Sequence, residues 1–185
     1  MHCVNLIRHP AAHAVHVHHI DAQVSVLPTD KLQIQYLLGG DVDQLRMPAG
    51  TAPRRADNLW QHTCFEAFIS AANISRYCEL NFAPTGAWAA YRFDAYRLGM
   101  TPIEITPPII TTHREKNTLI LDVSVDLTTI LAIREYSALR LALSAVIEQS
   151  DGAQSYWALA HPPGKPDFHH PDNFALTLDR LKNPQ

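Results

Sequence analysis

The segment Thr63–Asp94 reads TCFEAFISAANISRYCELNFAPTGAWAAYRFD, and it is the part of the chain that decides the fold class. Apolar and polar side chains alternate along three short runs in it: Thr63–Ser70, Arg76–Ala83 and Ala87–Asp94. A period of two residues is typical of strands that bury one face. The tripeptide Pro84-Thr85-Gly86 separates the last two runs as a tight hairpin turn. The segment therefore predicts a three-stranded antiparallel meander.

Similar alternation continues on both sides of this meander. It predicts further strands at His13–Ile20, Gln23–Leu27, Lys31–Leu38, Thr118–Val125, Leu139–Glu148, Ser155–Ala160 and Phe174–Leu178. The Leu139 run is apolar enough for a buried helix, but its regular set of alternate apolar positions favours a strand. About ten short strands without a β-α-β rhythm predict an all-β antiparallel β-sandwich, with residues 1–185 in a single domain. The longest irregular stretch, Gly39–Asn58, is of a length that is usually functional or loosely ordered.

Composition and charge exclude several classes of function. Of the 185 residues, 46% are hydrophobic and 18% are charged, which excludes an intrinsically disordered chain. Fifteen Lys and Arg against eighteen Asp and Glu give a net charge of -3, which argues against a nucleic-acid or membrane-surface partner. No apolar run approaches the roughly 18 residues that a membrane span needs.

The N-terminus and the cysteines favour a cytoplasmic location. The first ten residues contain no apolar core of a secretory signal, although an exported chain stripped of its signal would look the same. Cys3, Cys64 and Cys78 form no CxxC pair and leave one cysteine over, which is more typical of a reducing compartment than of a disulfide scaffold. A bridge between Cys64 and Cys78 across neighbouring strands is the minor alternative.

The side chains of the meander can be sorted by face, because successive residues of a strand point to opposite sides. We assign Tyr91 and Phe93 to the core, and a mixed polar and aromatic set to the opposite face: Glu66, Tyr77, Glu79, Asn81, Trp88, Arg92 and Asp94. Flat rings and planar hydrogen-bonding groups are the side chains that bind polyhydroxylated ligands. The alternative is a solvated face on which Glu66 and Glu79 pair with nearby arginines.

Two stretches of this region carry a resemblance to a known family. Asp57–Ile69 places Trp60 ahead of a Glu66-x-Phe68-Ile69 strand, and Tyr77-x-Glu79-x-Asn81 then leads to a Pro-x-Gly turn and Trp88. This pattern, with the closing segment Ser155–His170, resembles the DOMON-like superfamily, and more closely its bacterial branch related to family 9 carbohydrate-binding modules. The resemblance covers roughly residues 55–178.

The resemblance implies a β-sandwich that binds sugar in some members and haem in others, without chemistry of its own. It carries over as motif positions Trp60, Glu66, Tyr77, Glu79, Asn81 and Trp88. Haem-binding members use an axial Met and His. Here Met47 and Met100 lie in irregular segments, and nothing in the sequence pairs either of them with a particular histidine.

The eleven histidines raise the question of a metal site. His16 and His18 share one strand face, and His169-His170 lie near Asp167 and Asp172 in a proline-rich loop. Neither group has the spacing of a known zinc motif, and both could instead be ordinary surface or loop residues. The loop His161–Asn173, with Trp157 at its base, is also placed to border a ligand site.

Catalysis finds less support. No GxSxG motif is present, and Cys64 and Cys78 lie on predicted strands rather than at a helix N-terminus. The best enzymatic alternative is a glycoside hydrolase that uses Glu66 and Glu79.

The sequence thus predicts a non-enzymatic module for a carbohydrate or a related small polar ligand, with no required cofactor; haem or metal bound through histidines is the rival. The predicted ligand contacts are Trp60, Glu66, Tyr77, Glu79, Asn81, Trp88, Arg92 and Trp157.

Overall fold

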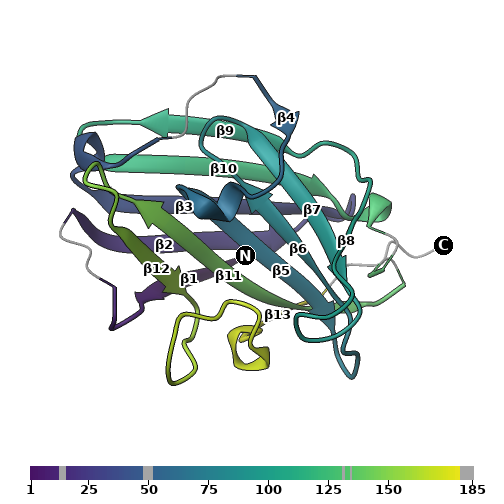
Figure 1. Ribbon diagram of the computed structural model, residues 1–185. Coiled ribbons are helices and arrows are strands. Elements are labelled where there is room, and N and C mark those ends of the chain that lie inside the picture. The colour runs from purple at the N-terminus through teal and green to yellow at the C-terminus, as the bar shows by residue number, and fades with distance from the viewer. Residues whose placement is uncertain (13–15, 48–51, 131, 134, 180–185) are drawn as a thin grey trace.

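Two β-sheets pack their apolar faces together in the computed structural model, which describes residues 1–12, 16–47, 52–130, 132–133 and 135–179 (Figure 1). Sheet A has the order β1 (His2–Arg8), β2 (Val17–Val26), β3 (Lys31–Gly40), β10 (Thr118–Asp126) and β9 (Ile109–Arg114). Sheet B has the order β4 (Arg54–Arg55), β7 (Ala87–Phe93), β6 (Tyr77–Phe82), β5 (Cys64–Ala71), β11 (Ala138–Glu148) and β12 (Gln154–Ala158). The predicted all-β sandwich is confirmed.

Short elements complete the two sheets. β8 (Thr101–Pro102) pairs with β7, and β13 (Leu176–Asp179) pairs with β11. The helical elements of the described residues are single 3₁₀ turns: η1 (Val42–Gln44), η2 (Leu59–Gln61), η3 (Leu127–Thr129) and η4 (Pro171–Asn173). None of these turns is long and apolar enough to cross a membrane.

The main core lies between the sheets, where alternate residues of each strand meet. In β3 the side chains of Leu32, Ile34, Tyr36 and Leu38 are buried, while the intervening residues are more exposed. Facing residues from β5, β6 and β11 complete the same cluster. This is the inward and outward alternation that the sequence predicts for the Lys31 run, and the Leu139 run is the strand β11, as predicted.

The N-terminal part differs from the prediction in two ways. The structure forms β1 at His2–Arg8, where no strand was predicted, and β1 joins the sheets by pairing with both β2 and β12. The predicted runs His13–Ile20 and Gln23–Leu27 form one continuous strand, β2, without a turn between them. Residues 13–15 lie outside the described residues, as do residues 48–51 of the predicted irregular stretch Gly39–Asn58.

Sheet B is buried on both of its faces, which the sequence did not predict. Every residue of β5 and β6 is buried, and β11 is buried along most of its length. A second apolar cluster that includes Phe68, Tyr77, Tyr91, Phe93 and Phe174 lies on the outer face. Phe168 of the loop of residues 161–173 packs in this cluster, and the loop lies below β11 and β12 in Figure 1. This outer face is where the polar side chains of the meander lie.

Candidate functional site

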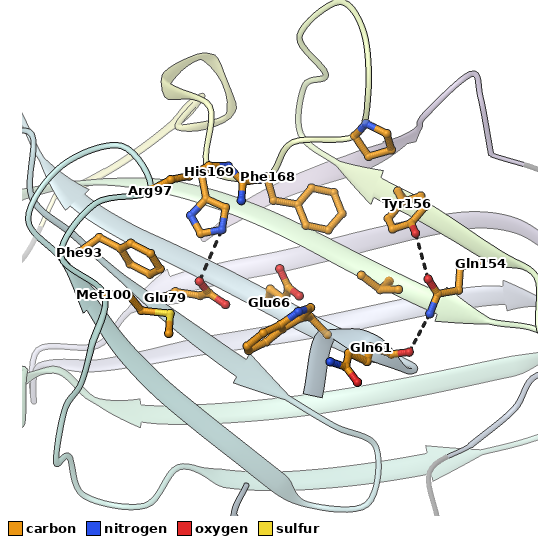
Figure 2. A pocket seen from close by; sticks show the side chains of 13 residues that line it. Gln61, Glu66, Glu79, Phe93, Arg97, Met100, Gln154, Tyr156, Phe168 and His169 are labelled. Carbon is orange, nitrogen blue, oxygen red and sulfur yellow. Dashed lines mark hydrogen bonds and ion pairs between the residues drawn. The ribbon is translucent and has the colours of Figure 1, made fainter. Parts of the chain in front are cut away.

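A cavity of about 520 Å³ opens on the outer face of sheet B (Figure 2). Its floor is formed by strand residues, and its walls by η2, by the loop of residues 94–100 after β7, by β12 and by the loop of residues 161–173. The lining residues are Trp60, Gln61, Glu66, Glu79, Phe93, Arg97, Met100, Val146, Gln154, Tyr156, Pro166, Phe168 and His169. The loop of residues 161–173, which the sequence places at the border of a ligand site, thus borders this cavity through Phe168 and His169.

The register of the central strands places both glutamates on this face. On β5, Glu66 lies opposite Asn81 of β6 on one side and opposite Ser144 of β11 on the other. Glu79 of β6 lies opposite Phe68, two residues along the strand from Glu66. Glu66 and Glu79 therefore project to the same side, and both line the cavity.

The predicted faces of the third strand are inverted. β7 places Tyr91 opposite Glu79 and Phe93 opposite Tyr77, so both aromatic residues belong to the site face. Trp88 lies opposite Phe82, in the main core, and is 5% exposed. The guanidinium of Arg55 lies over the Trp88 ring, 5.5 Å from its centre. The placement of Trp88 among the ligand contacts is therefore wrong.

Arg92 and Trp157 also lie away from the cavity. Arg92 is opposite Cys78, on the core side of the sheet, and its Nε lies 3.4 Å from a carboxylate oxygen of Asp94. Trp157 is 4% exposed in the main core, and its indole donates a hydrogen bond of 3.0 Å to the Ser155 hydroxyl. Its neighbour Tyr156 points to the cavity instead, because adjacent strand residues face opposite ways.

The cysteines also separate by face. Cys64 lies on the site side, near Asn81, whereas Cys78 belongs to the main core. Both thiols are free and buried, and their side chains project to opposite sides of the sheet. The geometry does not allow the minor alternative of a bridge between them.

Tyr77 and Asn81 lie one layer behind the cavity wall, where they hold other side chains. The ring of Tyr77 stacks on Phe93, with 4.8 Å between the ring centres. Asn81 is completely buried, and its amide donates a hydrogen bond of 2.8 Å to Glu79 Oε1. Both residues therefore act as support for the site rather than as its surface.

Trp60 is the indole that lines the cavity. It lies on η2, directly before β5, and its ring makes an edge contact with Tyr91 at 6.1 Å. The hydroxyl of Tyr91 in turn donates a hydrogen bond of 2.6 Å to Asp57. Asp57, Tyr91 and Trp60 therefore form a short chain that supports the indole at the edge of the cavity.

Glu66 is a buried acid with unused hydrogen-bonding capacity. It is 2% exposed, and its Oε1 atom has no hydrogen-bond partner among the described residues. The Ser144 hydroxyl donates to Oε2 over 3.4 Å. Burial, and then the negative charge of Glu79, raise the pKa of Glu66 well above its usual value. A buried oxygen without a partner is costly, and it marks the point at which a ligand donor would be most favourable.

A chain of contacts links Glu79 to Arg97 at the protein surface. The Arg97 amide donates to the Tyr77 hydroxyl, which lies 2.8 Å from His169 Nδ1. The other ring nitrogen of His169, Nε2, faces Glu79 Oε2 at 3.7 Å. Burial raises the pKa of Glu79 to about 7, while burial and the Arg97 charge lower the pKa of His169 to about 4. Near neutral pH this contact therefore involves a neutral imidazole.

Asp167 connects the two loops that border the cavity. Its carboxylate accepts hydrogen bonds from the Tyr96 hydroxyl and from two nitrogens of Arg97, the shorter at 2.7 Å. Its backbone carbonyl accepts from the Asn173 amide at 2.6 Å. Burial alone would raise the pKa of Asp167, but the hydrogen bonds from Tyr96 and Arg97 outweigh it and hold the pKa below its usual value. The cavity wall is thus closed by a charged hydrogen-bond network.

The raised pKa of Glu66 gives a testable dependence of stability on pH. The folded state keeps the Glu66 proton to a higher pH than the unfolded chain, which releases it near the ordinary glutamate pKa. The contribution of protonated Glu66 to the free energy of unfolding is therefore full at low pH and is lost as the pH rises. From about pH 5 to about pH 7, wild type is expected to lose stability relative to Glu66→Gln, by at most about 1.4 kcal/mol per pH unit. His169 contributes with the opposite sign, but it is present in both proteins. Urea unfolding at several pH values measures the difference.

The matched control for that series is Glu115→Gln, which makes the same chemical change at an exposed position. Its stability is expected to follow wild type at every pH. A constant difference between wild type and Glu66→Gln over this pH range would contradict the account of Glu66.

The histidines do not assemble a metal site in the described residues. No group of three or more His, Cys, Asp or Glu side chains is close enough to hold an ion. His170 Nδ1 accepts a hydrogen bond from the Asp172 amide and so caps η4, and the His16 amide donates to Gln149 over 3.4 Å. The contact of His170 is the loop role that the sequence analysis set against the metal hypothesis, whereas His16 lies just before β2 rather than on the predicted strand face.

Haem fits the cavity poorly, although Met100 and His169 both line it. His169 Nδ1 is hydrogen-bonded to the Tyr77 hydroxyl, and Nε2 faces the Glu79 carboxyl. Neither ring nitrogen is directed into open space as an axial ligand would be. The donor set is therefore that of a polar ligand site.

The cavity residues that the sequence did not identify come mainly from loops and from one misassigned strand. Arg97 and Met100 follow no periodic pattern, so no signal in the sequence places them at the cavity, whereas Phe168 lies in the loop that was expected to border a ligand site. Tyr156 could have been found, because it alternates with Trp157 on a predicted strand. Trp157 was chosen in place of Tyr156 because the larger indole was treated as the ligand contact.

Comparisons with known proteins identify the fold. No protein-family model matches the sequence, and no curated protein matches it. Among solved structures, a Bacteroides uniformis protein whose carbohydrate binding is inferred matches with a TM-score of 0.67 and 11% identity, over 97% of this chain and 86% of that one. A family 9 carbohydrate-binding module from Caldicellulosiruptor kristjanssonii, in complex with cellotriose, matches with a TM-score of 0.58 and 10% identity, over 98% and 84%.

The same kind of module in complex with glucose matches with a TM-score of 0.55 and 8% identity, over 94% of this chain and 81% of that one. The chain therefore has a β-sandwich fold like that of family 9 carbohydrate-binding modules. The wider relation to the DOMON-like superfamily stays a prediction.

Proposed function

We propose that this protein is a non-enzymatic binding module that holds a short saccharide in the cavity on the outer face of sheet B. The observation that carries the proposal is the Glu66 Oε1 atom, a buried acceptor without a partner in the wall of an aromatic-lined cavity. A sugar hydroxyl is a donor of the required kind. The fold, shared with modules in complex with glucose and cellotriose, supports the same assignment.

The remaining walls have the chemistry that a pyranose ring requires. Trp60 and Tyr156 offer apolar ring faces for the C–H groups of a sugar. Gln61 and Gln154 offer side-chain amide groups for its hydroxyls. The Gln154 amide is fixed by two hydrogen bonds: it donates one of 2.7 Å to the backbone carbonyl of Gln61 and accepts one of 2.9 Å from the Tyr156 hydroxyl. Fixed polar groups reduce the entropy that a ligand has to offset on binding.

Isothermal titration calorimetry on the full chain tests the proposal. Glucose, cellotriose, amino sugars and uronic acids, with their short oligomers, are titrated in turn. Saturable binding with one site per chain is expected for at least one of them. The absence of binding to every member of the panel would overturn the proposal.

A glycoside hydrolase is the second candidate, because two buried carboxyl groups with raised pKa values line one cavity. Chromatography of the ligand after prolonged incubation with the protein distinguishes it from a binding module. The binding module is expected to return the saccharide intact. Release of shorter products that is lost in Glu66→Gln and retained in Glu115→Gln would establish the hydrolase.

A further inference from the structure

The two carboxyl groups of the cavity lie close together on neighbouring strands. Glu66 and Glu79 are diagonal neighbours on β5 and β6, a relation in which side chains are within reach of a shared ligand. Figure 2 shows both on the cavity floor, below Phe93 and Phe168. Glu66 Oε1 has no partner in the described residues, although the side chain is almost completely buried. The cavity floor therefore brings together the carboxyl oxygens of Glu66 and Glu79, which are hydrogen-bond acceptors.

The basic side chains that line the cavity make no charged hydrogen bond to the two acids within the described residues. His169 faces Glu79 at 3.7 Å, but its ring is packed against Phe68 and Phe93, and the burial that this entails favours the neutral imidazole. The charge of Arg97 lowers the pKa of Glu79, but the Arg97 guanidinium is bonded through Nε and Nη2 to Asp167. The side-chain hydrogen bonds that the two acids accept come from the uncharged Asn81 amide and the Ser144 hydroxyl.

The walls above the floor favour a cation as well. Trp60, Phe93, Phe168 and Tyr156 line the cavity, and the faces of such rings attract ammonium groups at short range. A sugar hydroxyl could also donate to Glu66, but it carries no charge. With a hydroxyl bound, the two acids either stay protonated or ionise without a cationic partner. An ammonium group supplies both the donor and the charge.

We propose that the ligand is an amino sugar, whose protonated amine binds between Glu66 and Glu79. This inference rests on the proposed function. The sugar ring then lies against Trp60, and the remaining hydroxyls reach Gln61 and Gln154. The neutral acetylated or hydroxylated analogues of that sugar bind more weakly, because they cannot form a charge-assisted hydrogen bond with the two acids.

Calorimetry with glucosamine, glucose and N-acetylglucosamine tests this inference. Glucosamine is expected to bind at least about tenfold more tightly than either neutral sugar, the usual advantage of a charged over a neutral buried hydrogen bond. Equal or tighter binding of glucose would overturn the inference while leaving the proposed function in place. If no saccharide binds, both the inference and the proposed function are overturned.

Glu66→Gln removes the charge while keeping the shape of the side chain. It is expected to abolish the preference for glucosamine over glucose, whereas Glu115→Gln keeps it. A preference that survives in Glu66→Gln would contradict the role given to this acid.

Proton release provides a readout that needs no variant. When the ammonium group binds near pH 6, the acids are expected to ionise and release up to about one proton, which calorimetry detects as a dependence of the heat on buffer ionisation. Glucose binding is expected to release none. Equal proton exchange for the two sugars would overturn the inference.

Other groups that face the acids could contribute to this exchange. They are Cys64 on β5, Tyr77 on β6, Tyr91 on β7, and Arg97, Asp167 and His169 on the loops. On β11, Glu148 is paired with Arg46 and His62. Burial raises the pKa of the Cys64 thiol, raises that of Tyr77 to about 12 and, together with Asp57, raises that of Tyr91 still further, so these groups stay protonated near pH 6. Repeating the measurement in Glu66→Gln, where release is expected to fall, assigns the proton to the acid pair.

Discussion

Tyr36→Ala is expected to lower the free energy of unfolding by about 3–5 kcal/mol, the usual cost of removing a fully buried aromatic ring. The Tyr36 ring on β3 is completely buried, and its centre lies 5.0 Å from that of Phe65 on β5. Its hydroxyl also donates a hydrogen bond of 2.8 Å to the backbone carbonyl of Glu66. This one side chain therefore links sheet A to the strand that carries the principal acid of the site. Urea unfolding measures the loss.

Two variants control for this experiment. Tyr36→Phe keeps the ring and removes the hydroxyl, so a smaller loss of about 1–3 kcal/mol is expected. Ile109→Ala changes an exposed side chain on β9 and is expected to cost less than about 0.5 kcal/mol. A cost for Tyr36→Ala no greater than that of Ile109→Ala would contradict the packing described for the two sheets.

Trp60→Ala is expected to weaken saccharide binding at least about 30-fold, equivalent to about 2 kcal/mol. The indole lines the cavity and is supported from behind by Tyr91, so its removal takes away a rigid apolar surface at little cost to the core. Calorimetry measures the affinity, and circular dichroism checks the fold.

The matched control for Trp60→Ala is Leu98→Ala, which removes an exposed apolar side chain from the adjacent loop, outside the lining of the cavity. Its affinity is expected to equal that of wild type. Unchanged affinity in Trp60→Ala would exclude the indole from the binding surface and would place the ligand elsewhere.

Strand parity predicted the part of the site that depends on local pattern alone. Glu66 and Glu79 lie on one face because each follows the alternation of its own strand, and the turn between these strands keeps them in register. The sequence placed the loop His161–Asn173 at the border of a ligand site, but residues 94–100 and 161–173 have no periodic signal, so it left open whether this face is exposed or covered. The structure forms a lined cavity there.

The inversion of β7 has a specific cause. Tyr91 and Phe93 are two large aromatic residues on one face of this strand, and hydrophobicity alone assigns that face to the core. The hairpin decides otherwise: Ala83 and Ala87 are joined across the three-residue loop Pro84-Thr85-Gly86, with Gly86 at positive φ. Counting outward from that pair places Tyr91 opposite Glu79. Turn length was therefore the better guide to the face.

The placement of the tryptophans illustrates the same limit. Trp88 and Trp157 are large side chains that suit either a sugar or a core, and composition cannot separate the two uses. The structure buries both between the sheets and leaves Trp60 to line the cavity. The three indoles of this chain therefore report on two different environments.

That difference allows one direct test of saccharide binding on the outer face of sheet B. Nuclear magnetic resonance of the ¹⁵N-labelled chain follows the indole N–H signals of Trp60, Trp88 and Trp157 while glucosamine or cellotriose is added. A saturable shift of the Trp60 signal, with the signals of Trp88 and Trp157 unchanged, is the predicted result. A titration in which Trp60 stays fixed while either core indole shifts, or in which none of the three responds to either sugar, would contradict it.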